Sequence, residues 1–321
     1  MTNFLLLALG VVLLTVGGEA LIRGSLAVAQ RFNISPLLSG LIIVGFGTST
    51  PELVVSVNAA INQQPDIAVG NVVGSNIGNI LLILGACALI TPLAVRPLAL
   101  RRDAVTVVLT CLLFLVLALD DHLGRLDAAV LLSVFGGYLV WAYWTERYHA
   151  APSAEVHRAE AQEVSRVPTS MLWTVGAILL GLALLIAGSR AMLTGSVGIA
   201  RSLGVSEAAI GLTIVAIGTS LPEFSVSLIA AIRRHADVAV GNILGSNIFN
   251  LVGILGVSAL LQPLPLHARI IQFDQWVMLV TALALFSFLY SANQLSRLEG
   301  GLLLTGYVTY VALSFSPVVG P

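Results

Sequence analysis

The sequence predicts an all-α integral membrane protein. Ten transmembrane helices would form two inverted five-helix repeats, with broken helices at a central site. Three observations indicate this fold class. Only 10% of the 321 residues are charged and 57% are apolar, whereas soluble domains carry about 25% charged residues. The apolar residues gather in ten long runs, and one unusual segment occurs twice, at residues 45–85 and 216–256. Such a duplication indicates two structurally similar halves.

The apolar runs define the expected spans. Most of them reach the roughly 20 residues that a helix needs to cross about 30 Å of hydrocarbon. They fall at about 4–22, 37–61, 69–91, 104–120, 127–145, 171–189, 207–232, 238–261, 275–291 and 299–317. The first repeat is therefore expected at residues 1–147 and the second at 171–321. The polar stretch between them, residues 148–170, is expected to be a cytoplasmic linker.

The number of spans sets the relation between the repeats. Five crossings per half place the second copy upside down in the membrane relative to the first. We therefore expect a pseudo-two-fold axis in the membrane plane, an arrangement found in many secondary transporters.

The arginines indicate the orientation, since the chain has no lysine. Eleven of them fall in the connections after spans 1, 3, 5, 7 and 9, and only four fall on the opposite side. Positive charges favour the cytoplasmic side. We therefore expect a multi-pass protein of the inner (plasma) membrane with both termini outside. The N-terminus lacks a basic leader region and a cleavage site, so its first apolar run is expected to remain as a span.

Two glutamates lie deep within the apolar runs. Glu52 and Glu223 occupy equivalent positions of the two copies. An ionised carboxylate at the membrane centre costs several kcal/mol, and such residues usually face a cavity or bind a partner. The alternative is a carboxyl group held protonated by packing. Duplication of the pair together with all its neighbours favours a functional role.

A proline precedes each glutamate and is expected to break its helix. Pro51 has no N–H group, so the carbonyl of Gly47 loses its helical partner, and Pro222 does the same to Gly218. Broken helices are tolerated at membrane depth where they line a cavity, and their free carbonyls can bind cations. The alternative is a simple proline kink whose carbonyls bond to hydroxyl groups of the same turn. The hydroxyl groups on these two turns belong to Thr48, Ser49, Thr219 and Ser220.

The following span of each repeat supplies a second polar face. Ser75 and Asn79 are four residues apart and share one face of a helix, as do Ser246 and Asn250. Glycines repeat every four residues along the same helices, a spacing that lets helix backbones approach closely. These glycines would bring the hydroxyl and amide groups up against the glutamates.

The donor atoms of this candidate site are all oxygens. Without histidine or cysteine, zinc and copper are poor candidates, whereas Ca²⁺ and Na⁺ suit carboxylate, amide and hydroxyl oxygens. Mg²⁺ fits less well because it releases its water reluctantly. Two carboxylates can neutralise one Ca²⁺ or be shared by several Na⁺, which is a physical basis for exchange.

A calcium channel is an alternative, although inverted repeats around a closed site favour a carrier. We expect no cofactor, no nucleic acid and no obligatory protein partner beyond the transported ions and the bilayer. An enzyme is a distant alternative, since no nucleophile–base pair or G-x-S-x-G motif occurs.

Two paired motifs carry a resemblance to a known family. G-T-S-x-P-E occurs at 47–52 and 218–223, and G-N-x-x-G-S-N-I-x-N occurs at 70–79 and 241–250. The chain resembles the calcium/cation antiporter superfamily, in particular the prokaryotic sodium/calcium exchangers, over essentially its whole length. The resemblance implies that spans 1 and 6 slide as a gate across the other eight. It also implies that Glu52 and Glu223 hold Ca²⁺ with help from the backbones of Thr48 and Thr219. The implied Na⁺ ligands are Gly45, Thr48, Ser75 and Glu52 on one side, and Ala216, Thr219, Ser246 and Glu223 on the other, with Asn79 and Asn250 completing the centre.

One site position departs from part of that family. Some prokaryotic relatives and the potassium-dependent branch carry aspartate where this chain has Asn250, which argues against potassium co-transport. The proton/calcium branch usually has acidic residues in these helices, so Asn79 and Asn250 also argue mildly against proton coupling. Antiport driven by protons or another cation stays the alternative function.

Glu19 and Arg190 occupy equivalent positions near the ends of spans 1 and 6. They are expected either to tune the gate or, as the simpler alternative, to reach the interface as ordinary charged side chains.

Overall fold

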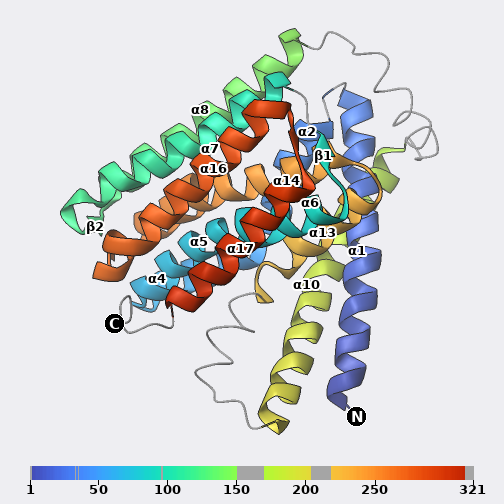
Figure 1. Cartoon of the computed structure of the whole chain (residues 1–321), viewed down its shortest axis with the longest axis horizontal. Helices are drawn as coiled ribbons and strands as arrows, with labels where there is room; N and C mark the ends of the chain where they lie inside the picture. Colours follow the sequence, from blue (N-terminus) through green and yellow to red (C-terminus); the bar gives the residue numbers. More distant parts are fainter. Residues whose placement is uncertain are drawn as a thin grey trace.

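The computed structural model describes residues 2–32, 34, 36–94, 97–149, 170–203 and 218–314. Nearly all of this part of the chain is helical (Figure 1). Most of the expected linker at 148–170 lies outside the described residues, as does the first part of the apolar run at 207–232.

The first repeat consists of five helical stretches, two of them interrupted by π-helical turns. The elements are α1 (Thr2–Phe32), α2 (Pro36–Ser39), η1 (Gly40–Gly45), α3 (Phe46–Thr48), α4 (Thr50–Ile61), α5 (Pro65–Gly78), η2 (Asn79–Leu84), α6 (Gly85–Ile90), α7 (Pro97–Leu117), the 3₁₀ turn η3 (Ala118–Asp120) and α8 (Arg125–His149). Pro51 lies in the first turn of α4 and Pro65 is the first residue of α5, positions where a missing N–H group costs no helical hydrogen bond.

The second repeat follows the same order where it is described. Its elements are α10 (Met171–Ser202), α13 (Leu221–Ile232), α14 (Ala236–Ile248), η5 (Phe249–Ile254), α15 (Leu255–Leu261), η6 (Ile270–Asp274), α16 (Gln275–Ala292) and α17 (Arg297–Ser314). The π-helical turns η2 and η5 fall at equivalent places in the two sequences.

The described residues contain seven helices long and apolar enough to cross a membrane, and eight if one bent pair is a single span. The bent pair is Gly40–Thr48 and Thr50–Ile61, whose axes differ by 48°. This break lies at the position that Pro51 predicts. Equivalent α13 begins at Leu221, directly after the turn before Pro222. The count of ten spans stays an expectation, because the seventh run is described only from residue 218.

Helices α1 and α10 form a pair at one edge of the molecule (Figure 1). Glycines bring the two backbones into contact. A Cβ atom added at Gly17 would lie 2.9 Å from the carbonyl oxygen of Gly181, and one added at Gly181 would lie 2.8 Å from the backbone nitrogen of Leu21. Close approach of this kind is typical of small residues at helix interfaces in membranes. The seam holds the two first helices of the repeats directly against each other.

Two short antiparallel strand pairs link the repeats at the ends of the helices. β1 (Leu93–Ala94) pairs with β4 (Gln294–Leu295), and β2 (His122–Leu123) pairs with β3 (Leu264–Pro265). Each pair joins a connection of one repeat to a connection of the other. The first strand of each repeat pairs with the second strand of the other repeat, as a local two-fold relation requires.

Helix α14 occupies the centre of the packed molecule. Every residue from Asp237 to Ile248 is buried. It packs against η1 and α2 of the first repeat and against α13 of its own repeat. Gly245 contacts the backbone of Leu41, a position where any larger side chain would clash. This packing brings the second polar motif of one repeat against the broken helix of the other.

Candidate cation-binding site

The two glutamates lie at the first turns of the helices that follow the breaks. Glu52 belongs to α4 and Glu223 to α13, and each is only 1% exposed. The Ser220 hydroxyl donates to Oε1 of Glu52 at 3.1 Å, and the Ser49 hydroxyl donates to Oε1 of Glu223 at 2.8 Å. Each carboxylate is therefore held by a serine of the other repeat. The two broken turns, residues 47–50 and 218–221, meet at a single site.

The second oxygen of each carboxylate has no partner in the part of the chain that the structure describes. Oε2 of Glu52 and Oε2 of Glu223 are buried without a hydrogen bond, and within the described part of the chain neither glutamate forms an ion pair. A buried carboxylate oxygen without a donor is costly in a low-dielectric environment. A bound cation or a proton would remove that cost.

Four asparagines behind the glutamates form a reciprocal ladder. The Asn76 amide nitrogen donates to the carbonyl oxygen of Asn247 at 3.1 Å, and the Asn247 amide nitrogen donates to the carbonyl oxygen of Asn76 at 3.3 Å. Asn79 then donates to Oδ1 of Asn247 at 2.9 Å, and Asn250 donates to Oδ1 of Asn76 at 3.0 Å. The ladder links α5 and η2 of the first repeat to α14 and η5 of the second.

This ladder fixes which way the outer amides point. A backbone carbonyl only accepts, so Asn76 and Asn247 must turn their nitrogens toward it and their oxygens away. Those oxygens need donors, which Asn79 and Asn250 supply from their own amide nitrogens. Oδ1 of Asn79 and Oδ1 of Asn250 are thereby left buried, and no described residue donates to them. The same holds for Oγ1 of Thr219.

The two outer asparagines also lie at irregular helix turns. Asn79 begins the π-helical turn η2, and Asn250 lies within η5. A π-helical turn inserts one extra residue per turn, and such turns occur frequently at functional sites. Here they place an amide at the same point of both repeats.

A second pair of asparagines supports the glutamate backbones. Asn71 donates to the carbonyl oxygen of Glu52 at 3.3 Å and to the Ser56 hydroxyl at 2.9 Å. Asn242 donates to the carbonyl oxygen of Glu223 at 3.2 Å and to an equivalent serine at 2.8 Å. These bonds tie the helix of each second motif to the helix that carries the glutamate.

The remaining candidate residues lie around the same turns. The carbonyl oxygen of Gly45 accepts from the Ser246 hydroxyl at 3.0 Å and from the Thr48 hydroxyl at 3.4 Å. The Ser220 hydroxyl also approaches the Ser75 hydroxyl at 3.4 Å. Of the twelve candidates, Ala216 alone lies outside the described residues.

The two carbonyls freed by proline both accept from hydroxyl groups, but only Gly47 is satisfied by its own turn, as the simpler alternative expects. The carbonyl of Gly47 accepts from the Thr50 hydroxyl at 2.8 Å, and the carbonyl of Gly218 accepts from the Ser189 hydroxyl of α10 at 2.6 Å. Hydroxyl groups thus replace the missing N–H groups. Both carbonyls already have a hydrogen-bond donor, so neither requires a cation to satisfy it.

Several residues of this network were not singled out from the sequence. They are Asn71, Asn76, Ser189, Asn242 and Asn247. The four asparagines belong to the duplicated motif, so their recurrence in both copies was a usable signal. Ser189 lies outside the motifs and carried no such signal.

The assembled donors are two carboxylates, two amides and several hydroxyls. Within the described residues, no group of three or more His, Cys, Asp or Glu lies together. The site therefore differs from the nitrogen- and sulfur-rich centres that hold zinc or copper, and it matches the oxygen donors that hard cations prefer.

Comparison with known proteins identifies the family. The family model described as sodium/calcium exchanger protein matches residues 2–144 and 173–316. The chain belongs to the sodium/calcium exchanger family. It is therefore a membrane transporter of the cation antiporter class.

Individual relatives cover nearly the whole exchanger chain. A protein from Alkalimonas amylolytica named putative antiporter CaxA is 40% identical over 96% of this chain and 97% of its own length. The inner membrane protein YrbG of Escherichia coli is 34% identical over 98% of both chains. Among solved structures, the sodium–calcium exchanger NCX_Mj, soaked with Na⁺ and Ca²⁺, superposes with a TM-score of 0.83 at 30% identity. That match covers 98% of this exchanger and 99% of NCX_Mj.

Proposed function

We propose that this exchanger moves Na⁺ and Ca²⁺ in opposite directions by alternating access, with both ions competing for the site between Glu52 and Glu223. One observation carries the proposal. Four buried oxygens of this site, two from the glutamates and two from Asn79 and Asn250, have no hydrogen-bond partner among the described residues. They are the oxygens that a cation would bind.

The proposed Ca²⁺ ligands come from both repeats. The carboxylates of Glu52 and Glu223 would bind Ca²⁺ with the oxygens of Asn79 and Asn250 and the backbones of Thr48 and Thr219. Ca²⁺ accepts about six to eight oxygens in flexible geometry, which this set can approach.

The Na⁺ ligands would be divided between the two repeats. The proposed Na⁺ ligands are Gly45, Thr48, Ser75 and Glu52 on one side, and Ala216, Thr219, Ser246 and Glu223 on the other. Ser49 and Ser220 orient the opposite carboxylates and lie within reach of the same ions.

Charge explains why one ion must replace the other. Two ionised carboxylates buried at membrane depth are strongly unfavourable without a cation. Ca²⁺ neutralises both charges at once, and several Na⁺ can do so together. A carrier that changes conformation only with a neutralised site would couple the two ions obligatorily.

The repeats supply a mechanism for access. We propose that residues 1–147 and 171–321 form inverted halves joined by the linker at 148–170, in an inner membrane with both termini outside. The close glycine seam would make α1 and α10 move as one unit relative to the helices that carry the site. Ser189 of α10 bonds to the broken turn at Gly218, so this movement would reach the site directly.

The experiment uses proteoliposomes that contain the purified exchanger. Vesicles loaded with Na⁺ and diluted into Na⁺-free medium are expected to take up Ca²⁺, and vesicles loaded with choline are not. The Glu52→Gln and Glu223→Gln variants should lose this uptake. Uptake driven by a proton gradient and indifferent to Na⁺ would replace this proposal with proton/calcium antiport, since the unpartnered glutamate oxygens also suit protons.

A further inference from the structure

A groove between α1 and α13 lies apart from the ion site. It has a volume of about 400 Å³, within the range of small-ligand sites. It is lined by Thr15, Val16, Glu19, Ile229, Ile232 and Arg233. None of these residues belongs to the candidate ligand set.

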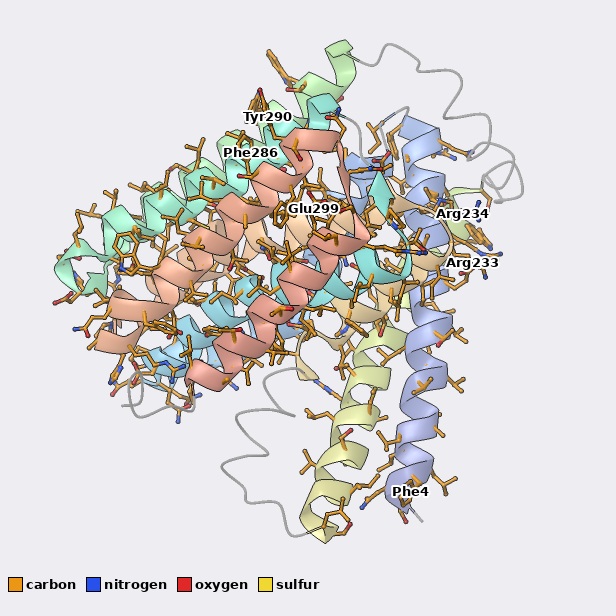
Figure 2. All side chains as sticks on the ribbon, in the orientation of Figure 1. Phe4, Arg233, Arg234, Phe286, Tyr290 and Glu299 are labelled. Atoms are coloured by element: carbon orange, nitrogen blue, oxygen red, sulfur yellow. The ribbon has the colours of Figure 1, made fainter. Side chains whose placement is uncertain are left out.

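Charged side chains lie along one side of the groove. Glu19 lies between two arginines, with Oε1 at 2.7 Å from Arg23 and Oε2 at 3.4 Å from Nε of Arg233. The two arginine side chains are 55% and 50% exposed. Arg234 follows directly, and Figure 2 shows Arg233 and Arg234 together at the edge of the molecule beside α1. Arg233 lines the groove itself, and Arg23 reaches it through Glu19. Among the described residues, this side of the groove therefore has three arginines for one acid, and its charge is net positive.

The rest of the groove lining includes exposed apolar side chains. Val16 of α1 is 52% exposed and Ile232 of α13 is 59% exposed. Both belong to apolar helices, and Val12, one turn before Val16, is 57% exposed as well. In a bilayer, exposed valine and isoleucine side chains on a membrane helix face lipid. The groove therefore combines a cationic side with an apolar wall that would face lipid.

The first repeat provides an internal comparison for the arginines. The turn after α4 contains Asn62 and Gln63 where the turn after α13 contains Arg233 and Arg234. The backbone is the same, since Gln63 and Arg234 both adopt the left-handed conformation, with φ of 58° and 63°. The fold of this turn does not require arginine. The paired charge is a property of one repeat only.

We propose that this groove binds a phospholipid with an anionic headgroup taken from the surrounding bilayer. The phosphate would lie against Arg23, Arg233 and Arg234, and an acyl chain would lie along Val16 and Ile232. Basic pockets between transmembrane helices are suited to acidic lipid headgroups. A soluble anion would use the arginines but leave the apolar wall uncovered, so the combined surface favours a lipid.

The test measures the thermal stability of the purified, detergent-solubilised exchanger with added lipid. A ligand that binds the folded state raises the melting temperature with its concentration. Phosphatidylglycerol is expected to raise it by several degrees more than phosphatidylcholine. The variant R233N/R234Q, which copies the first-repeat turn, should lose this difference. The control R125Q/R297Q removes two exposed arginines outside the groove and should keep it.

Two further arms separate the alternatives. Val16→Trp fills the lipid-facing wall without changing charge and should also lose the phosphatidylglycerol effect. Retention of the full effect in Val16→Trp or in R233N/R234Q would overturn the groove as the binding site. An equal shift with soluble glycerol phosphate would show a general anion site and overturn the lipid assignment. Should the double variant fail to fold, R233N and R234Q separately are each expected to lose part of the effect, and full retention in both would contradict the proposal.

Discussion

Ser49 of the first repeat donates its hydroxyl hydrogen to Oε1 of Glu223 in the second repeat at 2.8 Å. Ser220 and Glu52 form the same contact in the opposite sense at 3.1 Å. The carboxylate of each repeat is thus oriented by the broken turn of the other. An ion bound at either glutamate would therefore change a hydrogen bond that joins both halves of the molecule.

Removing one of these hydroxyls is expected to weaken calcium binding. Ser49 is fully buried and bonds to a carboxylate, and a hydrogen bond to a charged group contributes about 1.5–3 kcal/mol. Ser49→Ala should raise the Ca²⁺ concentration for half-maximal uptake about tenfold or more. Ser220→Ala should have a smaller effect, because Ser220 is only partly buried and its bond is longer. The control Ser133→Ala, whose hydroxyl is exposed, should match the wild type; equal effects of all three would argue against orientation by Ser49.

Neutralising either glutamate should abolish exchange. Glu52→Gln and Glu223→Gln keep the shape of the side chain but halve the charge that balances Ca²⁺. Sodium-driven Ca²⁺ uptake into vesicles should fall to the background of empty liposomes for both variants. Asp66→Asn changes an exposed acid on α5 and should transport normally. Substantial uptake by either glutamine variant would remove that glutamate from the site.

The asparagine ladder predicts energetic coupling between two residues. Asn76 accepts from Asn250 and so orients its amide oxygen. Asn76→Ala and Asn250→Ala should each weaken Ca²⁺ binding, and the double variant should weaken it by clearly less than the sum of the two free-energy changes. A double-mutant cycle measures this coupling. Asn58 is exposed, and Asn58→Ala combined with Asn250→Ala should be additive; additivity of both cycles would mean that the ladder does not orient Asn250.

The seam between α1 and α10 predicts opposite effects of one substitution at two glycines of the same helix. A Cβ atom at Gly181 would lie 2.8 Å from backbone atoms of α1, so Gly181→Ala should separate the helices and lower the melting temperature by several degrees. No described atom lies within 4 Å of a Cβ at Gly176, where alanine should be neutral or slightly stabilising because of its helix propensity. Thermal unfolding in detergent compares the two. A smaller loss at Gly181 than at Gly176 would contradict the seam.

The sequence predicted the parts of this molecule that depend on local chemistry. Apolar runs gave the helices, and Pro51 gave the 48° break before Glu52. Helix ends were less accurate: α1 continues to Phe32, ten residues beyond the expected run, because Arg23 and Arg31 end the apolar run but not the helix. Burial of both glutamates followed from their position among apolar residues.

Contacts between the repeats could not be predicted in the same way. Ser49 and Glu223 are 174 residues apart, and Asn79 and Asn247 are 168 apart. Periodicity places each of these residues on a helix face but does not say which partner it meets. The fate of the Gly218 carbonyl depends on Ser189, a residue of another helix without any motif. Such pairings arise only from packing of the whole chain.

The central claim is that Ca²⁺ and Na⁺ occupy one site built on two buried glutamates. Equilibrium binding of radioactive Ca²⁺ to the purified exchanger, repeated at rising Na⁺, tests it most directly. The account predicts one displaceable Ca²⁺ per chain, an apparent dissociation constant that rises steeply with Na⁺ but not with choline, and no binding to Glu52→Gln or Glu223→Gln. Calcium binding that is unaffected by Na⁺, or that persists in both variants, would contradict it.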